Sequence, residues 1–398
     1  MRCPRALTAI LTAVLATSCT TQPLQTEEVV ALMEAHQVPG MSVAVIDDYE
    51  VAWSEAFGVA GATTSRAVTT DTLFQTASIG KSVTAMTTLH QVRRGVLDLD
   101  EDVSAYLTSW AIPDNEYTDE NPVTVRGLLS HTAGVNGPGF VGYVPDLPLP
   151  TLRQTLDGAR PANNDPIRVT NAPGTYRYSS GGYQILEQVL NDATGSEFTE
   201  LVTETVFEPL GMTTSFYDPL PESNWSRVAV GHRSNGQPVV GGWHSYSEHA
   251  AGPFWTTPSD FALFGNEVML AYTGQSEVVI SQDLAVEMLT PVDSGYGLGL
   301  AITDDGGDRL HATHLGGSEG YKTLLVLYPE RGQGAVIMTN SDNGVELAWD
   351  VVDLLSLHFK WVSGVILSPT QTVFTVLAGL TLLGAGALFW RRRRSIRH

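Results

Sequence analysis

Cysteine and lysine are scarce in this sequence of 398 residues. The only two cysteines, Cys3 and Cys19, lie within the first 19 residues. The rest of the chain therefore has no disulfide framework and no cysteine-ligated zinc site. Lysine occurs only as Lys81, Lys322 and Lys360. Any lysine that takes part in chemistry has to be one of these three.

Positive charge is also in short supply. The chain has 22 Lys and Arg against 43 Asp and Glu, a formal net charge of −21, and seven of the arginines lie within a few residues of the two ends. Such an acidic surface repels phosphate backbones, which excludes a nucleic-acid partner. Periodic glycine or proline and internal repeats are likewise missing, whereas 43% of the residues are hydrophobic. The composition is typical of one large folded unit with additions at both ends.

Residues 1–19 have the pattern of a secretory signal peptide. Arg2 and Arg5 precede an apolar run that is too short to span a membrane stably. The run ends in Ala16-Thr17-Ser18-Cys19, which resembles a lipobox, although Ala16 stands where that pattern prefers leucine. Two outcomes stay open: lipid attachment at Cys19 or ordinary cleavage after Ser18.

The other end of the chain predicts a transmembrane helix. Residues 373–390 form an uncharged run of 18 residues, and a basic tail over 391–398 follows directly. The positive-inside rule then places the tail in the cytoplasm and the acidic body outside it, at the cell membrane. A buried core helix is the alternative, and the tail also loosely resembles the sorting tails that bacteria remove during surface attachment.

Between these ends, the pattern predicts one antiparallel sheet built from both termini of the body. Residues 41–57 read as a hairpin and residues 297–339 as a strand meander, and a helix over 348–359 closes the body. Helices alternate with long Pro- and Gly-rich loops over 96–260. The fold class is therefore α/β (α+β), with a mainly helical inserted domain and a cleft between the two halves as the expected active site.

The local signal that carries most chemistry is Ser78-Ile79-Gly80-Lys81. Residues three apart share a helix face, so Lys81 can reach the Ser78 hydroxyl, and serine needs such a neighbour to become nucleophilic. The same letters end like a nucleotide-binding loop, but Gln75 occupies the position where that loop needs glycine. Nucleotide binding is therefore excluded.

Four further segments accompany this pair. They are PGTYRYSSGGY over 173–183, HLGGSEG over 314–320, and the phrases LLSHTAG over 128–134 and AGPFWTTPSD over 251–260. In this order and spacing they resemble the serine β-lactamase and penicillin-binding-protein-like hydrolases, particularly the class C β-lactamase, DD-peptidase and esterase branch. The resemblance implies the β-lactamase/transpeptidase-like fold over a domain of residues 24–360.

The resemblance also implies roles. Ser78 corresponds to the nucleophile, Lys81 to its activating partner and Tyr178 to a tyrosine that shuttles protons. The backbone N–H groups of Ser78 and Gly317 correspond to an oxyanion hole, and Gly316 to a position that substrate approaches closely. Whether Lys81 or Tyr178 accepts the first proton stays open.

Two departures from the family pattern bear on the substrate. Ser180 stands where the family usually has asparagine, and His314 stands where β-lactamases usually have lysine. Both changes remove contacts to carboxylated amide substrates. We therefore expect a membrane-tethered serine hydrolase that cleaves D-amino-acid peptides, including peptidoglycan-derived ones, or small esters. A β-lactamase and a catalytically silent cell-wall-binding ectodomain are the alternatives.

The remaining candidate residues are expected to have mostly structural roles. His131 is expected to form a structural hydrogen bond in its turn. His311 and His314 lie three apart, on opposite faces of a strand, so that neither a metal nor any other cofactor is expected. Four aromatic residues are candidates for the wall of the cleft or for the core: Phe140, Tyr143, Tyr183 and Trp255.

Overall fold

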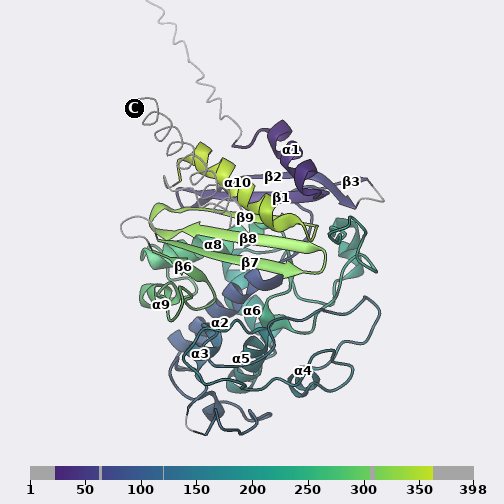
Figure 1. Cartoon of the computed structure of the whole chain (residues 1–398). Coiled ribbons are helices and arrows are strands. Elements are labelled where there is room, and N and C mark those ends of the chain that lie inside the picture. Colours follow the sequence, from purple (N-terminus) through teal and green to yellow (C-terminus); the bar gives the residue numbers. More distant parts are fainter. Residues whose placement is uncertain (1–22, 62–64, 120, 305–309, 362–398) are drawn as a thin grey trace, which may run out of the picture.

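The computed structural model describes residues 23–61, 65–119, 121–304 and 310–361 (Figure 1). The helices are α1 (Thr26–His36), α2 (Lys81–Arg93), α3 (Val125–Leu129), α4 (Leu152–Asp157), α5 (Ser180–Thr194), α6 (Phe198–Val202), α7 (Glu208–Leu210), α8 (Pro258–Tyr272), α9 (Gln282–Met288) and α10 (Gly344–Phe359). The strands are β1 (Gly40–Asp47), β2 (Glu50–Gly61), β3 (Arg66–Ala67), β4 (Phe74–Gln75), β5 (Trp255–Thr256), β6 (Ala301–Thr303), β7 (His311–Ser318), β8 (Tyr321–Tyr328) and β9 (Gln333–Thr339). Two short helical turns, η1 (Ala77–Gly80) and η5 (His249–Ala251), belong to the site described below.

A seven-stranded sheet with the order β3-β2-β1-β9-β8-β7-β6 forms the centre of the fold. All of its neighbouring strands run antiparallel, and β1 pairs with β9, so that N-terminal and C-terminal strands meet within one sheet. The sheet built from both termini, predicted from strand patterns at the two ends of the body, is confirmed. Helices are the main regular elements of the long segment between β3 and β6, as expected.

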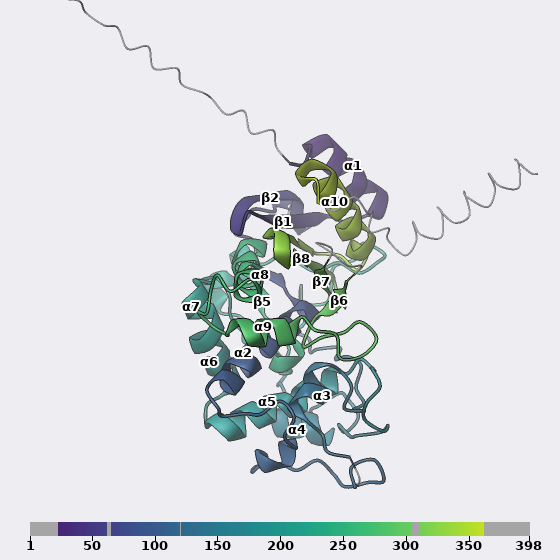
Figure 2. The same ribbon diagram turned by 90° about the vertical axis from the view of Figure 1, so that its left-hand side faces the viewer.

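Different layers cover the two faces of this sheet (Figure 2). Side chains alternate between faces along β8: Leu324 and Val326 join one core with α1 and α10, and Leu325 and Leu327 join the other core with α8. Because both faces are buried, the central strands are apolar on both sides. The second core continues into the helical region.

Helix α2 leads from the edge of the sheet into that helical region. Ten of its 13 residues are buried, including threonines and the lysine at its start. The hydroxyl of Thr88 donates to the Thr84 carbonyl at 2.8 Å, and the Thr84 hydroxyl donates to the Ala250 carbonyl at 2.9 Å. Hydrogen bonds of this kind make burial of polar side chains tolerable.

The prediction of a membrane-spanning helix is corrected by the structure. Across residues 23–61, 65–119, 121–304 and 310–361, none of the helices combines the length and apolarity needed to cross a bilayer. This finding overturns the transmembrane part of the predicted fold class and the membrane localisation that rested on it. The range named for the helix, 373–390, lies outside the described residues, as do the signal over 1–19 and the tail over 391–398.

Candidate active site

Ser78 lies in the turn η1, and α2 begins at Lys81 directly after it. The Lys81 side chain is fully buried, and its Nζ donates to Ser78 Oγ at 3.3 Å and to the carbonyl oxygen of Ala251 at 2.5 Å. Gly80 allows the backbone at Ser78 to pack closely against the backbone at Gly252, because a Cβ at position 80 would lie 2.0 Å from the carbonyl oxygen of Gly252. The chain therefore brings the predicted serine and lysine into contact.

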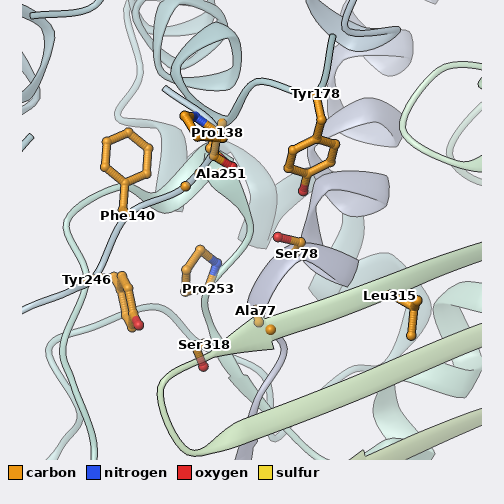
Figure 3. A pocket seen from close by; sticks show the side chains of 13 residues that line it. Ala77, Ser78, Pro138, Phe140, Tyr178, Tyr246, Ala251, Pro253, Leu315 and Ser318 are labelled. Carbon is orange, nitrogen blue, oxygen red and sulfur yellow. The ribbon is translucent and has the colours of Figure 1, made fainter. Parts of the chain in front are cut away.

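Tyr178 lies in the irregular segment that precedes α5. Its ring centroid is 5.1 Å from Lys81 Nζ, and its hydroxyl points toward Ser78 (Figure 3). The next residue, Ser179, caps α5, because its hydroxyl accepts the backbone N–H of Gly182 at 2.9 Å. The cap fixes where the helix starts, directly after the segment that carries Tyr178.

Ser180, the first residue of α5, is buried, and its hydroxyl donates to the Pro138 carbonyl at 3.2 Å. Both residues line the same pocket, so that this bond holds the loop at Pro138 against the helix. The hydroxyl that stands in place of the family's asparagine side chain is thus engaged within the protein.

The segment HLGGSEG begins within strand β7. Because side chains alternate between the two faces of a strand, the residues of this segment lie in two different environments. Leu315 and Gly317 line the pocket. His314 is buried behind it and is not among the lining residues; its ring centroid lies 6.4 Å from that of Tyr178. Gly316 is also absent from the lining, because it is packed against Thr323.

The tautomer of His314 follows from its single hydrogen bond. Nδ1 lies 2.8 Å from the carbonyl oxygen of Leu315, and since a carbonyl only accepts, Nδ1 is assigned the proton. Burial, with the nearby charge of Lys81, lowers the pKa of His314 to about 3. The ring is therefore neutral at physiological pH and supplies no positive charge.

Ser78 faces a pocket of about 290 Å³ (Figure 3). Its wall carries hydroxyl and apolar groups but no charged side chain; the lining residues are Ala77, Ser78, Pro138, Gly139, Phe140, Tyr178, Ser180, Tyr246, Ala251, Pro253, Leu315, Gly317 and Ser318. Phe140 lines the pocket, whereas the other three aromatic candidates, Tyr143, Tyr183 and Trp255, are buried elsewhere. Sequence reasoning missed Tyr246, which comes from an irregular segment without a motif.

A buried acidic pair behind the site was also missed. Glu187 Oε2 accepts the backbone N–H of Ala250 at 2.9 Å, next to the residue whose carbonyl contacts Lys81. Burial raises the pKa of Glu187 to about 8 and that of Glu248 to about 7. Both carboxyl groups therefore hold protons at pH values where an exposed glutamate is ionised.

Within the described ranges, no three His, Cys, Asp or Glu side chains come together as candidate metal ligands. The expectation that the protein needs neither a metal nor another cofactor stays a prediction.

Comparison with known proteins agrees with this geometry. A family model described as Beta-lactamase matches residues 26–355. The chain belongs to the Beta-lactamase family. The resemblance stated from the motifs is thereby confirmed, and so is the assignment as a serine hydrolase of this family.

Named relatives lie within the same family. Penicillin-binding protein 4 of Amycolatopsis lactamdurans is 29% identical over 337 residues, which cover 78% of this chain and 83% of that protein. A D-aminopeptidase of Brucella anthropi is 27% identical over 317 residues, which cover 77% of this chain and 57% of that protein. Among solved structures, the octameric penicillin-binding protein homologue from Pyrococcus abyssi aligns with a TM-score of 0.71 and 25% identity, covering 83% of this chain and 76% of that chain.

Proposed function

We propose that this Beta-lactamase-family hydrolase forms an acyl-enzyme on Ser78 and cleaves D-amino-acid peptides or small esters. The observation that carries the proposal is the contact of 3.3 Å between Lys81 Nζ and Ser78 Oγ. Ser78 and Tyr178 both line the pocket, and the Tyr178 hydroxyl points toward Ser78. Such a pair can take the serine proton as Ser78 attacks a carbonyl carbon.

The proposed reaction has an acylation step and a deacylation step. Ser78 Oγ bonds to the substrate carbonyl carbon, and its proton passes to the pair formed by Lys81 and Tyr178. The leaving amine or alcohol takes a proton from the same pair. The backbone N–H groups of Ser78 and Gly317 hold the oxyanion. Water then bonds to the acyl carbon and gives a proton to the same pair, the bond to Ser78 Oγ breaks, and Oγ regains a proton from the pair. Ser180 contributes indirectly, because its hydroxyl holds the loop at Pro138 against α5. His314 is a neutral neighbour of Lys81 and brings no charge to the site.

The charge distribution favours substrates without a carboxylate near the scissile bond. No charged side chain lines the pocket, and Leu315, which is 43% exposed, occupies the wall next to His314. Lys322 pairs with Gly317 across the strands, but its Nζ donates to Asp342 Oδ1 at 2.7 Å and to the Ser318 carbonyl at 3.1 Å. A substrate carboxylate would therefore lack the charge-assisted hydrogen bond that binds it in many sites. The similarity to a D-aminopeptidase supports D-amino-acid substrates.

The experiment measures kcat/KM for p-nitrophenyl esters, D-alanine p-nitroanilide and nitrocefin, which carries a carboxylate. We expect turnover of the ester or the D-amino-acid substrate to exceed that of nitrocefin. Leu315→Arg adds a cation to the wall and should raise the ratio of nitrocefin to ester turnover by about tenfold, whereas the neutral control Leu315→Gln should not. Nitrocefin hydrolysis by the parental protein at ~10⁷–10⁸ M⁻¹s⁻¹ would overturn the proposal in favour of a β-lactamase.

A further inference from the structure

We propose that His131 is a positioning residue, which holds the phenol of Tyr178 against Ser78; this inference rests on the proposed function. Tyr178 lies in neither a helix nor a strand. Its placement therefore depends on contacts that segment 173–179 makes with the rest of the protein, and the contacts that flank Tyr178 converge on one residue.

His131 binds the backbone on both sides of Tyr178. The N–H of Arg177 donates to the His131 carbonyl at 2.8 Å, and the N–H of Ser179 donates to His131 Nδ1 at 3.1 Å. Because a backbone N–H only donates, Nδ1 has to accept, and the proton of the neutral ring is assigned to Nε2. One residue thus fixes both peptide groups adjacent to the tyrosine.

The imidazole ring also packs against the phenol itself. The centroids of the His131 and Tyr178 rings are 4.3 Å apart, and the ring centroids of Tyr296 and Tyr183 lie 4.9 and 5.2 Å from that of His131. His131 is only 2% exposed. Burial, together with the charge of Lys81, lowers the pKa of His131 well below its ordinary value. The ring therefore stays neutral, and Nδ1 keeps the lone pair that accepts Ser179.

The backbone of His131 supports the same interpretation. Its φ is +60°, a left-handed conformation that side chains other than asparagine, aspartate and histidine rarely adopt. Residues in such strained backbone conformations persist only where the surrounding structure fixes them, and they are frequent at functional sites. Here the N–H of Gly174 donates to the Thr132 carbonyl at 2.8 Å and extends the contact between the two segments. Glycine would relieve the strain but would lack the ring and its acceptor.

Three variants separate these contributions. His131→Phe keeps a ring and removes the acceptor, His131→Asn keeps an acceptor and tolerates the left-handed backbone, and His131→Gly removes both while relieving strain. We expect kcat/KM for a p-nitrophenyl ester to fall by about 30-fold in the Phe and Gly variants and by no more than about fivefold in Asn. The control is His90→Phe, which alters a part-buried imidazole that contacts the Val279 carbonyl and does not line the pocket; it should keep parental turnover.

A double-mutant cycle tests whether His131 acts through Tyr178. In a Tyr178→Phe background, we expect His131→Phe, or His131→Gly if the former does not fold, to lower kcat/KM by less than about threefold. If the role of His131 were purely structural, its replacement would lower kcat/KM by the full 30-fold in both backgrounds. That result would overturn the inference while leaving the proposed function intact. Full activity of Tyr178→Phe alone would instead overturn the proposed role of Tyr178, and this inference with it.

Discussion

Lys81 Nζ lies 3.3 Å from Ser78 Oγ, and the same nitrogen lies 2.5 Å from the carbonyl oxygen of Ala251. The two acceptors come from η1 and η5, and Ala251 lies 170 residues after Lys81 in sequence, so the lysine amine joins the turn of the nucleophile to the loop before β5. These two contacts hold the fully buried amine beside the hydroxyl that it would activate.

Replacement of Lys81 should abolish the activation of Ser78 without unfolding the protein. Lys81→Met keeps the length of the side chain and removes the amine, and we expect the rate of Ser78 acylation to fall by about 10³-fold or more. Stopped-flow release of p-nitrophenol measures this rate, and thermal unfolding checks the fold. Lys360→Met removes an exposed lysine just after α10 and is the matched control. An acylation rate within tenfold of the parental rate would show that Lys81 is not the activating group.

The two glycines of β7 should respond very differently to alanine. A Cβ on Gly316 would lie 2.0 Å from Thr323 Oγ1 and 2.5 Å from the Thr76 carbonyl, whereas one on Gly317 meets nothing closer than 3.5 Å, at Lys322. We expect Gly316→Ala to lower the free energy of unfolding by about 1–3 kcal/mol and Gly317→Ala to change it by less than about 0.5 kcal/mol. Urea unfolding measures both values, and equal stabilities would contradict the packing described for this strand.

The buried Glu187 gives stability a distinct pH dependence. Because burial raises the pKa of Glu187 to about 8, the folded protein keeps this proton while an unfolded glutamate, with a pKa of 4.5, has lost it. The unfolded state therefore binds fewer protons up to about pH 8, and stability falls as pH rises, by at most about 1.4 kcal/mol per unit. Glu248 contributes in the same sense up to about pH 7.

The matched variant is Glu187→Gln, which keeps an acceptor for the Ala250 N–H and cannot ionise. Between pH 6.5 and 8, we expect the melting temperature of the parental protein to fall more than that of Glu187→Gln. This window lies above the range in which buried histidines such as His249, whose pKa burial lowers to about 4, act in the opposite sense. The control Glu50→Gln, at an exposed carboxylate, should follow the parental curve. Parallel curves for Glu187→Gln and the parent would show that this carboxyl group is already ionised.

Much of the fold could be predicted because local patterns carry it. Alternating apolar residues and short turns identify the strands at both ends, and Thr257, Pro258 and Asp260 mark the start of α8, where the Thr257 hydroxyl accepts the Asp260 N–H at 3.2 Å. The contact between Ser78 and Lys81 was also local, since three residues along a helical turn bring side chains together.

The rest depends on contacts that no local pattern reveals. Gln184, Glu187 and Gln188 are spaced like the solvent face of α5, yet all three are buried. The turn η5 packs against this helix, and Gln188 donates to Ser109 Oγ. His314, expected at the substrate, does not line the pocket, because alternation along β7 turns the histidine inward and Leu315 toward the pocket. Lining residues such as Tyr246 come from irregular segments whose path is set by the whole fold.

The most direct test of the central claim is the intact mass of the protein after exposure to a fluorophosphonate, with Ser78→Ala treated in parallel. We predict one adduct per chain on the parental protein, located at Ser78, and none on the variant. The same variant should lose p-nitrophenyl ester hydrolysis by several orders of magnitude. An adduct on Ser78→Ala, or ester hydrolysis by that variant at the parental rate, would contradict the account and place the nucleophile elsewhere.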